Sequence, residues 1–360
     1  MIYDIPSTSC ASTGPKIVAV GGGTGLSTML RGLKKYTDRL TAVVTVADDG
    51  GGSGQLRDEL KMLPPGDIRN CILALSETEP IMEKLIRYRF DAGSLKGQSF
   101  GNLFLAAMNG MYGGDFVAAV KSVSDVLKVT GTVLPVTDCD TELVATLADG
   151  REVVGESNIG KAIIDFNSRI SRVRLRAKNG GKIRLLPDIR EKLAEADIIT
   201  IGPGSLYTSI LSTLAADDLA DAISAADAPT VYINNIMTQH GETDGYTAFD
   251  HAAAITAHTC VDFIDYCIVN SKRIDTPILK NYAEEESAEV ILDEERFKNR
   301  GIKLIKRNIA ALIDDKYIRH NPTALAEAIM DIANIERRRG VNISEEGVVL
   351  YEPNRKKNRG

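Results

Sequence analysis

The first residues suited to chemistry are four glycines and two hydroxyls, in the stretch Gly21-Gly22-Gly23-Thr24-Gly25-Leu26-Ser27. Consecutive glycines let the backbone approach a ligand closely, and a helix that begins there offers free N–H groups to an anion. The stretch matches neither the dinucleotide motif G-x-G-x-x-G nor the P-loop, which ends in G-K-[ST]. A tight turn without a ligand is the alternative. We predict a phosphate loop with ligand contacts at Gly22, Gly23, Thr24, Gly25 and Ser27.

Two adjacent carboxylates, Asp48 and Asp49, come before a second glycine-rich stretch. An acid at this point of a dinucleotide fold binds a ribose hydroxyl, and a pair of acids could instead hold a divalent cation or act on a substrate hydroxyl. An Asx turn that binds nothing is the alternative. If the protein is an enzyme, Asp48 and Asp49 are its predicted catalytic residues. The sequence does not fix whether a metal ion is required.

Four further polar stretches, at 64–70, 99–103, 202–209 and 234–244, have the composition of ligand-binding loops. The stretch at 202–209 repeats the glycine-then-helix arrangement of the first loop. Two such helix starts predict a bound diphosphate or a pair of phosphates. Asp67 has the alternative role of a helix N-cap, and Arg69 that of pairing with a nearby acid. The predicted ligand contacts in these stretches are Asp67, Arg69, Asn70, Asn102, Gly202, Gly204, Ser205, Asn235 and Thr238.

Short apolar runs stand before several of these loops and predict the strands that position them. Lys16–Val20 and Thr41–Ala47 are two such runs, and between them Leu26, Met29 and Leu30 recur at helical spacing. This β-α-β unit predicts a parallel pair with a right-handed crossover. The alternation continues along the chain, so we predict an α/β protein with a Rossmann-like, doubly wound and mostly parallel sheet. Ligands of such sheets bind at the carboxyl ends of the strands.

The domain organisation predicted from these patterns is one α/β domain over residues 16–340. Residues 1–15 are predicted to be a flexible leader, and residues 341–360 a C-terminal tail. The composition changes near residue 130, where two strand-like runs flank Asp149-Gly150, a hairpin signal. We therefore predict a β-rich insertion over about residues 130–185.

Composition restricts the class of protein. The 360 residues are 44% hydrophobic and 26% charged, with a formal net charge of -6, so no basic field attracts nucleic acid. Five scattered cysteines fit a reducing compartment. There is neither a secretory signal nor an apolar run of about 20 residues, the length needed to span a bilayer. We expect a cytoplasmic protein that binds no nucleic acid and does not insert into membranes.

The stretches "GGGTGLS", "VADDGGGSG", "PPGDIRN", "GNL", "IGPGSLYTS" and "NNIMTQHGETDGY" together resemble one family. They are similar to the YvcK-type proteins, known as gluconeogenesis factors, whose superfamily includes CofD, the 2-phospho-L-lactate transferase. The resemblance implies a cytoplasmic bacterial protein that binds UDP-N-acetylglucosamine and links carbon metabolism to peptidoglycan synthesis and cell shape. It also implies that Tyr282 and Arg319 contact the nucleotide sugar. Without the resemblance, Tyr282 would be interpreted as a surface residue. The sequence departs from the family pattern at Gly52 and His240.

Two functions follow as hypotheses. The first is a regulatory protein that binds a UDP-sugar or another nucleotide diphosphate and acts through cell-wall synthesis proteins. The alternative is a transferase that moves a phospholactyl-type group from a nucleotide diphosphate to an acceptor hydroxyl, for which a divalent metal ion would be required. Aromatic residues are only 5% of the chain, which offers little stacking surface for a deazaflavin acceptor, so we favour the first. Assembly of identical subunits stays open.

Overall fold

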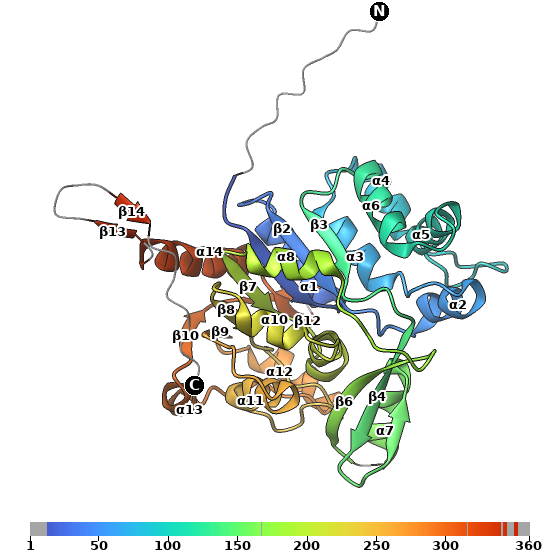
Figure 1. The fold of residues 1–360 in the computed structure, drawn as a ribbon. Helices are drawn as coiled ribbons and strands as arrows, with labels where there is room; N and C mark the ends of the chain where they lie inside the picture. Colours follow the sequence, from blue (N-terminus) through green and yellow to red (C-terminus); the bar gives the residue numbers. More distant parts are fainter. Residues whose placement is uncertain (1–12, 167, 315, 340, 344–348, 352–360) are drawn as a thin grey trace, which may run out of the picture.

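The computed structural model describes residues 13–166, 168–314, 316–339, 341–343 and 349–351 (Figure 1). Its centre is a seven-stranded sheet in the order β10-β9-β8-β7-β1-β2-β3, in which every neighbouring pair is parallel. The fold class predicted from the sequence is therefore confirmed. The strands are β1 (Ile17–Gly21), β2 (Leu40–Val44), β3 (Thr132–Pro135), β7 (Ile198–Ile201), β8 (Thr230–Ile233), β9 (Tyr266–Asn270) and β10 (Lys303–Arg307).

The chain order of the strands reverses at β1, and this reversal determines where a ligand can bind. From β1 the chain builds outward through β2 and β3 on one side, and β7 to β10 then build outward on the other side. Ile17 of β1 pairs with both Leu40 of β2 and Ile198 of β7. In open α/β sheets, ligands bind at such a reversal, outside the carboxyl ends of the strands, which here are the ends of β1 and β7.

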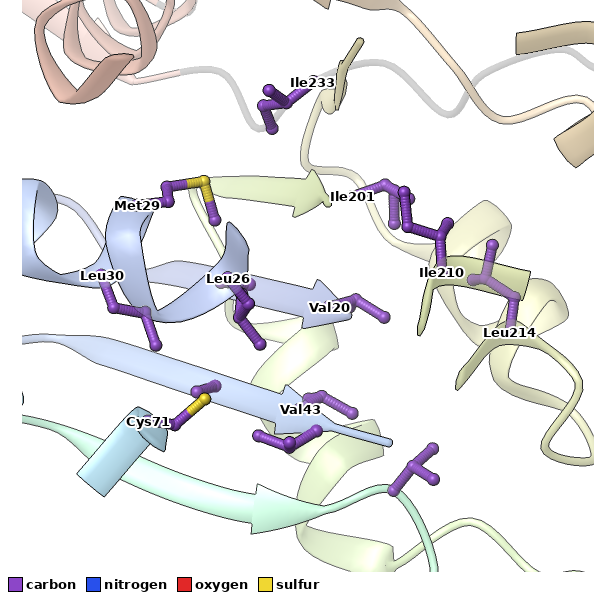
Figure 2. Packing of buried hydrophobic residues seen from close by; sticks show 14 of the residues in the cluster. Val20, Leu26, Met29, Leu30, Val43, Cys71, Ile201, Ile210, Leu214 and Ile233 are labelled. Atoms are coloured by element: carbon purple, nitrogen blue, oxygen red, sulfur yellow. The ribbon is translucent and has the colours of Figure 1, made fainter. Parts of the chain in front are cut away.

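Helices cover both faces of this sheet (Figure 1). In α1, Leu26, Met29, Leu30 and Leu33 are fully buried, as their helical spacing predicts. Figure 2 shows the first three of these side chains near Val20 of β1 and Val43 of β2, among other buried residues. The helices are α1 (Gly23–Leu33), α2 (Gly51–Leu60), α3 (Gly66–Leu75), α4 (Pro80–Arg87), α5 (Phe100–Met111), α6 (Phe116–Val126), α7 (Glu156–Phe166), α8 (Pro187–Ala194), the π-helix η1 (Leu206–Leu211), α9 (Ser212–Leu214), α10 (Leu219–Ala225), α11 (Ala248–Thr259), α12 (Thr276–Glu284), α13 (Glu294–Arg300) and α14 (Pro322–Arg339).

The segment between β3 and α8 in the sequence forms a separate antiparallel sheet. Its strands are β4 (Thr141–Leu147), β5 (Glu152–Val154) and β6 (Ile170–Ala177), in the order β5-β4-β6. The hairpin of β4 and β5 turns at Asp149-Gly150 as predicted, where Gly150 has φ +87° and Asp149 accepts the N–H of Arg151. Helix α7, which the sequence did not predict, packs on this sheet (Figure 1).

Two short ribbons complete the fold. Strands β11 (Ala310–Ile313) and β12 (Tyr317–His320) pair antiparallel, and so do β13 (Val341–Ile343) and β14 (Val349–Tyr351). Residues 1–12 of the predicted leader lie outside the described residues, as does the predicted tail apart from β13 and β14. None of the described helices has both the length and the apolar character needed to cross a membrane.

Candidate functional site

The crevice at the switch point contains a cavity of about 690 Å³, which we call the main cavity. Loops after β1, β7 and β8 form one side of it, and α7, α12 and β12 complete the wall. Nine of the predicted ligand contacts line it, namely Gly23, Thr24, Gly25, Gly204, Ser205, Asn235, Thr238, Tyr282 and Arg319. The topology thus brings together residues that are almost 300 positions apart in the sequence.

The first glycine loop starts α1 and faces the main cavity with Thr24 and Gly25. The N–H of Gly23 is already used, because it donates to Oδ2 of Asp67 at 2.8 Å. Ser27 is buried on the far side of the turn, and its hydroxyl donates to the carbonyl of Thr24 at 3.0 Å. Ser27 lies outside the main cavity, so the loop can offer a ligand the start of α1 but not that hydroxyl.

The two glycine loops pack directly against each other. A Cβ on Gly25 would lie 2.4 Å from the carbonyl oxygen of Pro203 in the second loop. A Cβ on Gly22 would lie 2.4 Å from Cγ2 of Thr45, and Gly202 has φ +80°, which favours glycine. Gly22 and Gly202 do not line the main cavity. Gly22 is therefore required by close side-chain packing, and Gly202 by its backbone conformation.

The second glycine loop leads into η1 and is held by a buried carboxyl group. The hydroxyl of Ser205 donates to Oε1 of Gln239 at 2.6 Å and lies 3.2 Å from Oε2 of Glu242. Burial raises the pKa of Glu242 to about 7. Hydrogen bonds from Ser205, the backbone of Tyr207 and the hydroxyl of Thr208 act in the opposite direction and lower this pKa. The hydroxyls of Ser205 and Thr208 are therefore engaged by Glu242 and Gln239, which both line the cavity.

The loop after β8 supplies polar groups to the middle of the main cavity. Oδ1 of Asn235 is buried and has no hydrogen-bond partner among the described residues. Thr238 is fixed by two bonds to Ala288, one donated by its N–H at 2.7 Å and one accepted by its hydroxyl at 2.9 Å. Asn235 is thus the group in this loop best placed to accept a hydrogen bond from a ligand.

Tyr282 and Arg319 line the part of the cavity formed by α12 and β12. Tyr282 is only 8% exposed and its hydroxyl accepts the N–H of Ile318 at 2.8 Å, so the interpretation as a surface residue is wrong. Arg319 is exposed and donates to the carbonyl of Ile318. His320 is held at 3.1 Å from the Asn234 carbonyl, and burial lowers the pKa of this imidazole to about 4, which keeps it neutral.

A second cavity of about 170 Å³, which we call the small cavity, lies beside the start of α2 and α3. Five further predicted site residues line it: Asp48, Asp67, Arg69, Asn70 and Asn102. The structure therefore divides the predicted ligand contacts between two cavities. Oδ1 of Asp48 accepts the N–H of Gly50 at 3.0 Å, which is the Asx turn of the alternative interpretation.

Asp67 stands between the two cavities. It lies in the first turn of α3 but caps α1, since its carboxylate accepts the N–H of Gly23. Burial, followed by the charge of Asp48, raises the pKa of Asp67 to about 6, and the bond from Gly23 opposes this shift. Asp67 thus connects the floor of the small cavity to the first glycine loop.

Asp49 lines neither cavity, and its side chain instead binds α7 in the segment between β3 and α8. Its Oδ1 accepts the N–H of Ser157 at 2.8 Å, in the first turn of α7. A carboxylate at a helix N-terminus satisfies a free N–H and interacts favourably with the helix dipole. In this arrangement Asp49 positions α7, which contributes Glu156 and Ser157 to the main cavity.

The sequence analysis did not identify Glu156, although the charges of the predicted acids act on it. Burial, followed by the charges of Asp48, Asp67 and Asp49, raises the pKa of Glu156 to about 8. Its only sequence signal is an acid directly after the glycine that ends a hairpin, a weak mark of a helix start. The sequence places Glu242 in a polar stretch but does not indicate that this side chain is buried.

Within the described residues, no three His, Cys, Asp or Glu side chains converge as metal ligands.

Comparison with known proteins gives the family. Residues 17–310 match the family model described as 2-phospho-L-lactate transferase CofD. The chain belongs to this CofD family. A relative from Thermoanaerobacterium thermosulfurigenes is 53% identical over 320 residues, which cover 89% of this chain and 97% of that protein.

Relatives with a stated role and a known structure extend the comparison. The "Gluconeogenesis factor" of Bacillus subtilis is 46% identical over 319 residues, or 88% of this chain and 98% of that protein. A crystal structure of a Bacillus halodurans protein superposes with a TM-score of 0.84 at 44% identity, and covers 88% of this chain and 100% of that one. The resemblance to gluconeogenesis factors of the CofD-like superfamily is thereby confirmed.

Proposed function

We propose that the main cavity binds a nucleotide sugar of the UDP-N-acetylglucosamine type, and that the protein is a cytoplasmic regulatory gluconeogenesis factor. In this role it links central carbon metabolism to cell-wall synthesis and cell shape through protein partners. The layout of the main cavity carries the proposal: two glycine loops, neutral polar groups, and the pair Tyr282 and Arg319 line one space. Its volume of about 690 Å³ lies within the usual range for such ligands.

Three glutamates line the main cavity, and two of them, Glu156 and Glu242, are compatible with a bound diphosphate. Glu156 and Glu242 have pKa values raised to about 8 and about 7, so near pH 7 a large fraction of each carboxyl group is neutral. A neutral carboxyl group can donate a hydrogen bond to a phosphate oxygen. The diphosphate would lie at the start of α1, beside Thr24 and Gly25, where the helix dipole favours negative charge.

Calorimetry on the full chain tests this function. UDP-N-acetylglucosamine is expected to bind one molecule per chain, and UDP more weakly, since it lacks the sugar that would contact the loop of Asn235. Arg319→Gln should weaken both ligands, because the exposed guanidinium is the cation that this end of the main cavity offers to a phosphate. Folded protein that binds neither ligand at millimolar concentration would refute the proposal.

The transferase alternative is supported by the name of the family model and by the carboxylates between the two cavities. An acceptor hydroxyl would attack the phosphorus of the diphosphate, the nucleoside monophosphate would leave, and a carboxylate would take the hydroxyl proton. Since Asp49 is engaged with α7, Asp48 or Asp67 is better placed for that step. Release of nucleoside monophosphate that depends on an acceptor, and its loss in Asp67→Asn, would favour this alternative.

A further inference from the structure

The small cavity contains an arginine whose hydrogen bonds all go to neutral groups. The guanidinium of Arg69 is half-buried and donates to Oγ of Ser99 at 2.5 Å, to Oδ1 of Asn102 at 2.9 Å and to Oδ1 of Asn70 at 2.9 Å. These three oxygens hold its planar group in one orientation. Arg89 lines the same cavity and donates to the carbonyl of Gly97.

Neither arginine forms an ion pair within the described residues, although the charges of Asp48 and Asp67 in the same cavity act on Arg69. Both form hydrogen bonds but no ion pair there, whereas the neighbouring Arg87 pairs with Glu83 at 2.9 Å. The two carboxylates that line the small cavity have other partners, because Asp48 accepts from Gly50 and Asp67 accepts from Gly23.

A part-buried guanidinium that forms no direct ion pair is costly, and a second guanidinium nearby adds to the cost. Burial is the main cause that lowers the pKa of Arg69 and the charge of Arg89 is the next, and the charges of Asp48 and Asp67 offset only part of this shift. An anion that enters from solvent would remove this penalty. The fixed fork geometry of an arginine suits the paired oxygens of a phosphate or carboxylate group.

Neutral donors complete the lining. The amide nitrogen of Asn70 has no partner among the described residues, since only its oxygen is engaged with Arg69. Gly51 and Gly52 line the small cavity in the first turn of α2, where backbone N–H groups favour an anion. The volume of about 170 Å³ accommodates one compact group and excludes a whole nucleotide.

We propose that the small cavity is a second ligand site, which binds a compact oxyanion, a phosphate or carboxylate group, on Arg69 and Arg89. This inference does not depend on which nucleotide occupies the main cavity. The two sites are joined through Asp67, whose carboxylate holds the N–H of Gly23 at the start of α1. The anion comes either from a free ion or from the acidic group of a larger compound.

Calorimetric titration of the full chain with inorganic phosphate tests the site. One phosphate per chain is expected, with millimolar affinity that weakens at least tenfold in Arg69→Gln and in Arg89→Gln. Arg89 is exposed, so its variant reports on binding even if Arg69→Gln does not fold. Arg87→Gln is the matched control because that arginine already has an acidic partner, and its affinity should be unchanged.

Two further sets of measurements identify the chemical source of the anion and the cavity that binds it. Titration with acetate compares a carboxylate group with phosphate, and titration with glycerol phosphate compares a phosphate ester with the free ion. Binding of any of these probes supports the site if it depends on both Arg69 and Arg89. Arg319→Gln, in the main cavity, should leave phosphate binding intact. The inference is overturned if none of the probes binds at tens of millimolar, if Arg89→Gln binds as the parent does, or if Arg319→Gln removes the binding.

Discussion

Replacement of Glu156 by glutamine should stabilise the protein in alkaline solution and leave its stability unchanged in acid. The carboxyl group is half-buried and faces the charges of Asp48, Asp67 and Asp49, so its pKa rises from an ordinary 4.5 to about 8. A group that binds its proton more tightly in the folded state costs no stability below the ordinary pKa. The cost develops as the pH rises from 4.5 towards 8, because the folded chain must then hold a charge that the unfolded chain holds freely.

The magnitude follows from the same difference. Each pH unit corresponds to about 1.4 kcal/mol, so the gap between 4.5 and about 8 sets an upper limit of roughly 5 kcal/mol. Solvent reaches part of the side chain and screens the neighbouring charges, so we expect about 2 kcal/mol. Glutamine keeps the shape of the side chain and carries no charge at any pH.

The assay is urea unfolding of parent and variant between pH 5 and pH 9. Equal free energies of unfolding are expected near pH 5, with the variant about 2 kcal/mol more stable at pH 9. Asp165→Asn is the matched control, since Asp165 is an exposed acid on the same helix, and its effect should not change with pH. A difference for Glu156→Gln that is the same at pH 5 and pH 9 would refute the reasoning.

Three other substitutions test the site. Gly25→Ala should lower the free energy of unfolding by about 1–3 kcal/mol, because the new Cβ meets the Pro203 carbonyl. The control Gly110→Ala, at an open helical position, should be neutral or stabilising by up to about 1 kcal/mol. Equal effects of the two substitutions would contradict the packing of the two loops. Asp49→Ala should speed amide exchange in α7, and Asp49→Asn, which can still cap the helix, should restore protection; if Asp49→Asn instead abolishes a measured turnover, the catalytic prediction for this residue stands. Arg319→Gln should weaken UDP-N-acetylglucosamine binding by roughly tenfold or more, the loss of a charge-assisted bond, and unchanged affinity would remove this residue from the ligand site.

The sheet could be predicted from the sequence because its signals are local. Runs such as that before Gly21 are buried on both faces, and α1 shows helical spacing of leucines over its whole length. The polar loops followed from this, since every loop that leaves a parallel strand arrives at the same edge. Helix α7 was missed because it follows a hairpin, and its N-terminus is fixed by a carboxylate 108 residues earlier in the chain.

The division of the site into two cavities could not be predicted for a similar reason. Asp67 and Arg69 are two positions apart on one helix start, yet one holds the first glycine loop and the other turns to Ser99 and Asn102. Sequence proximity gives no information on such partners. The hydrogen bond from Ser205 to Glu242 likewise joins two loops that follow different strands.

A crystal structure of the full chain with UDP-N-acetylglucosamine tests the central claim most directly. We predict density for the diphosphate between the start of α1, beside Thr24 and Gly25, and the guanidinium of Arg319, and for the rest of the nucleotide sugar between the loop of Asn235 and Tyr282. A ligand bound outside the main cavity, or an empty main cavity in crystals soaked at millimolar concentration, would contradict it.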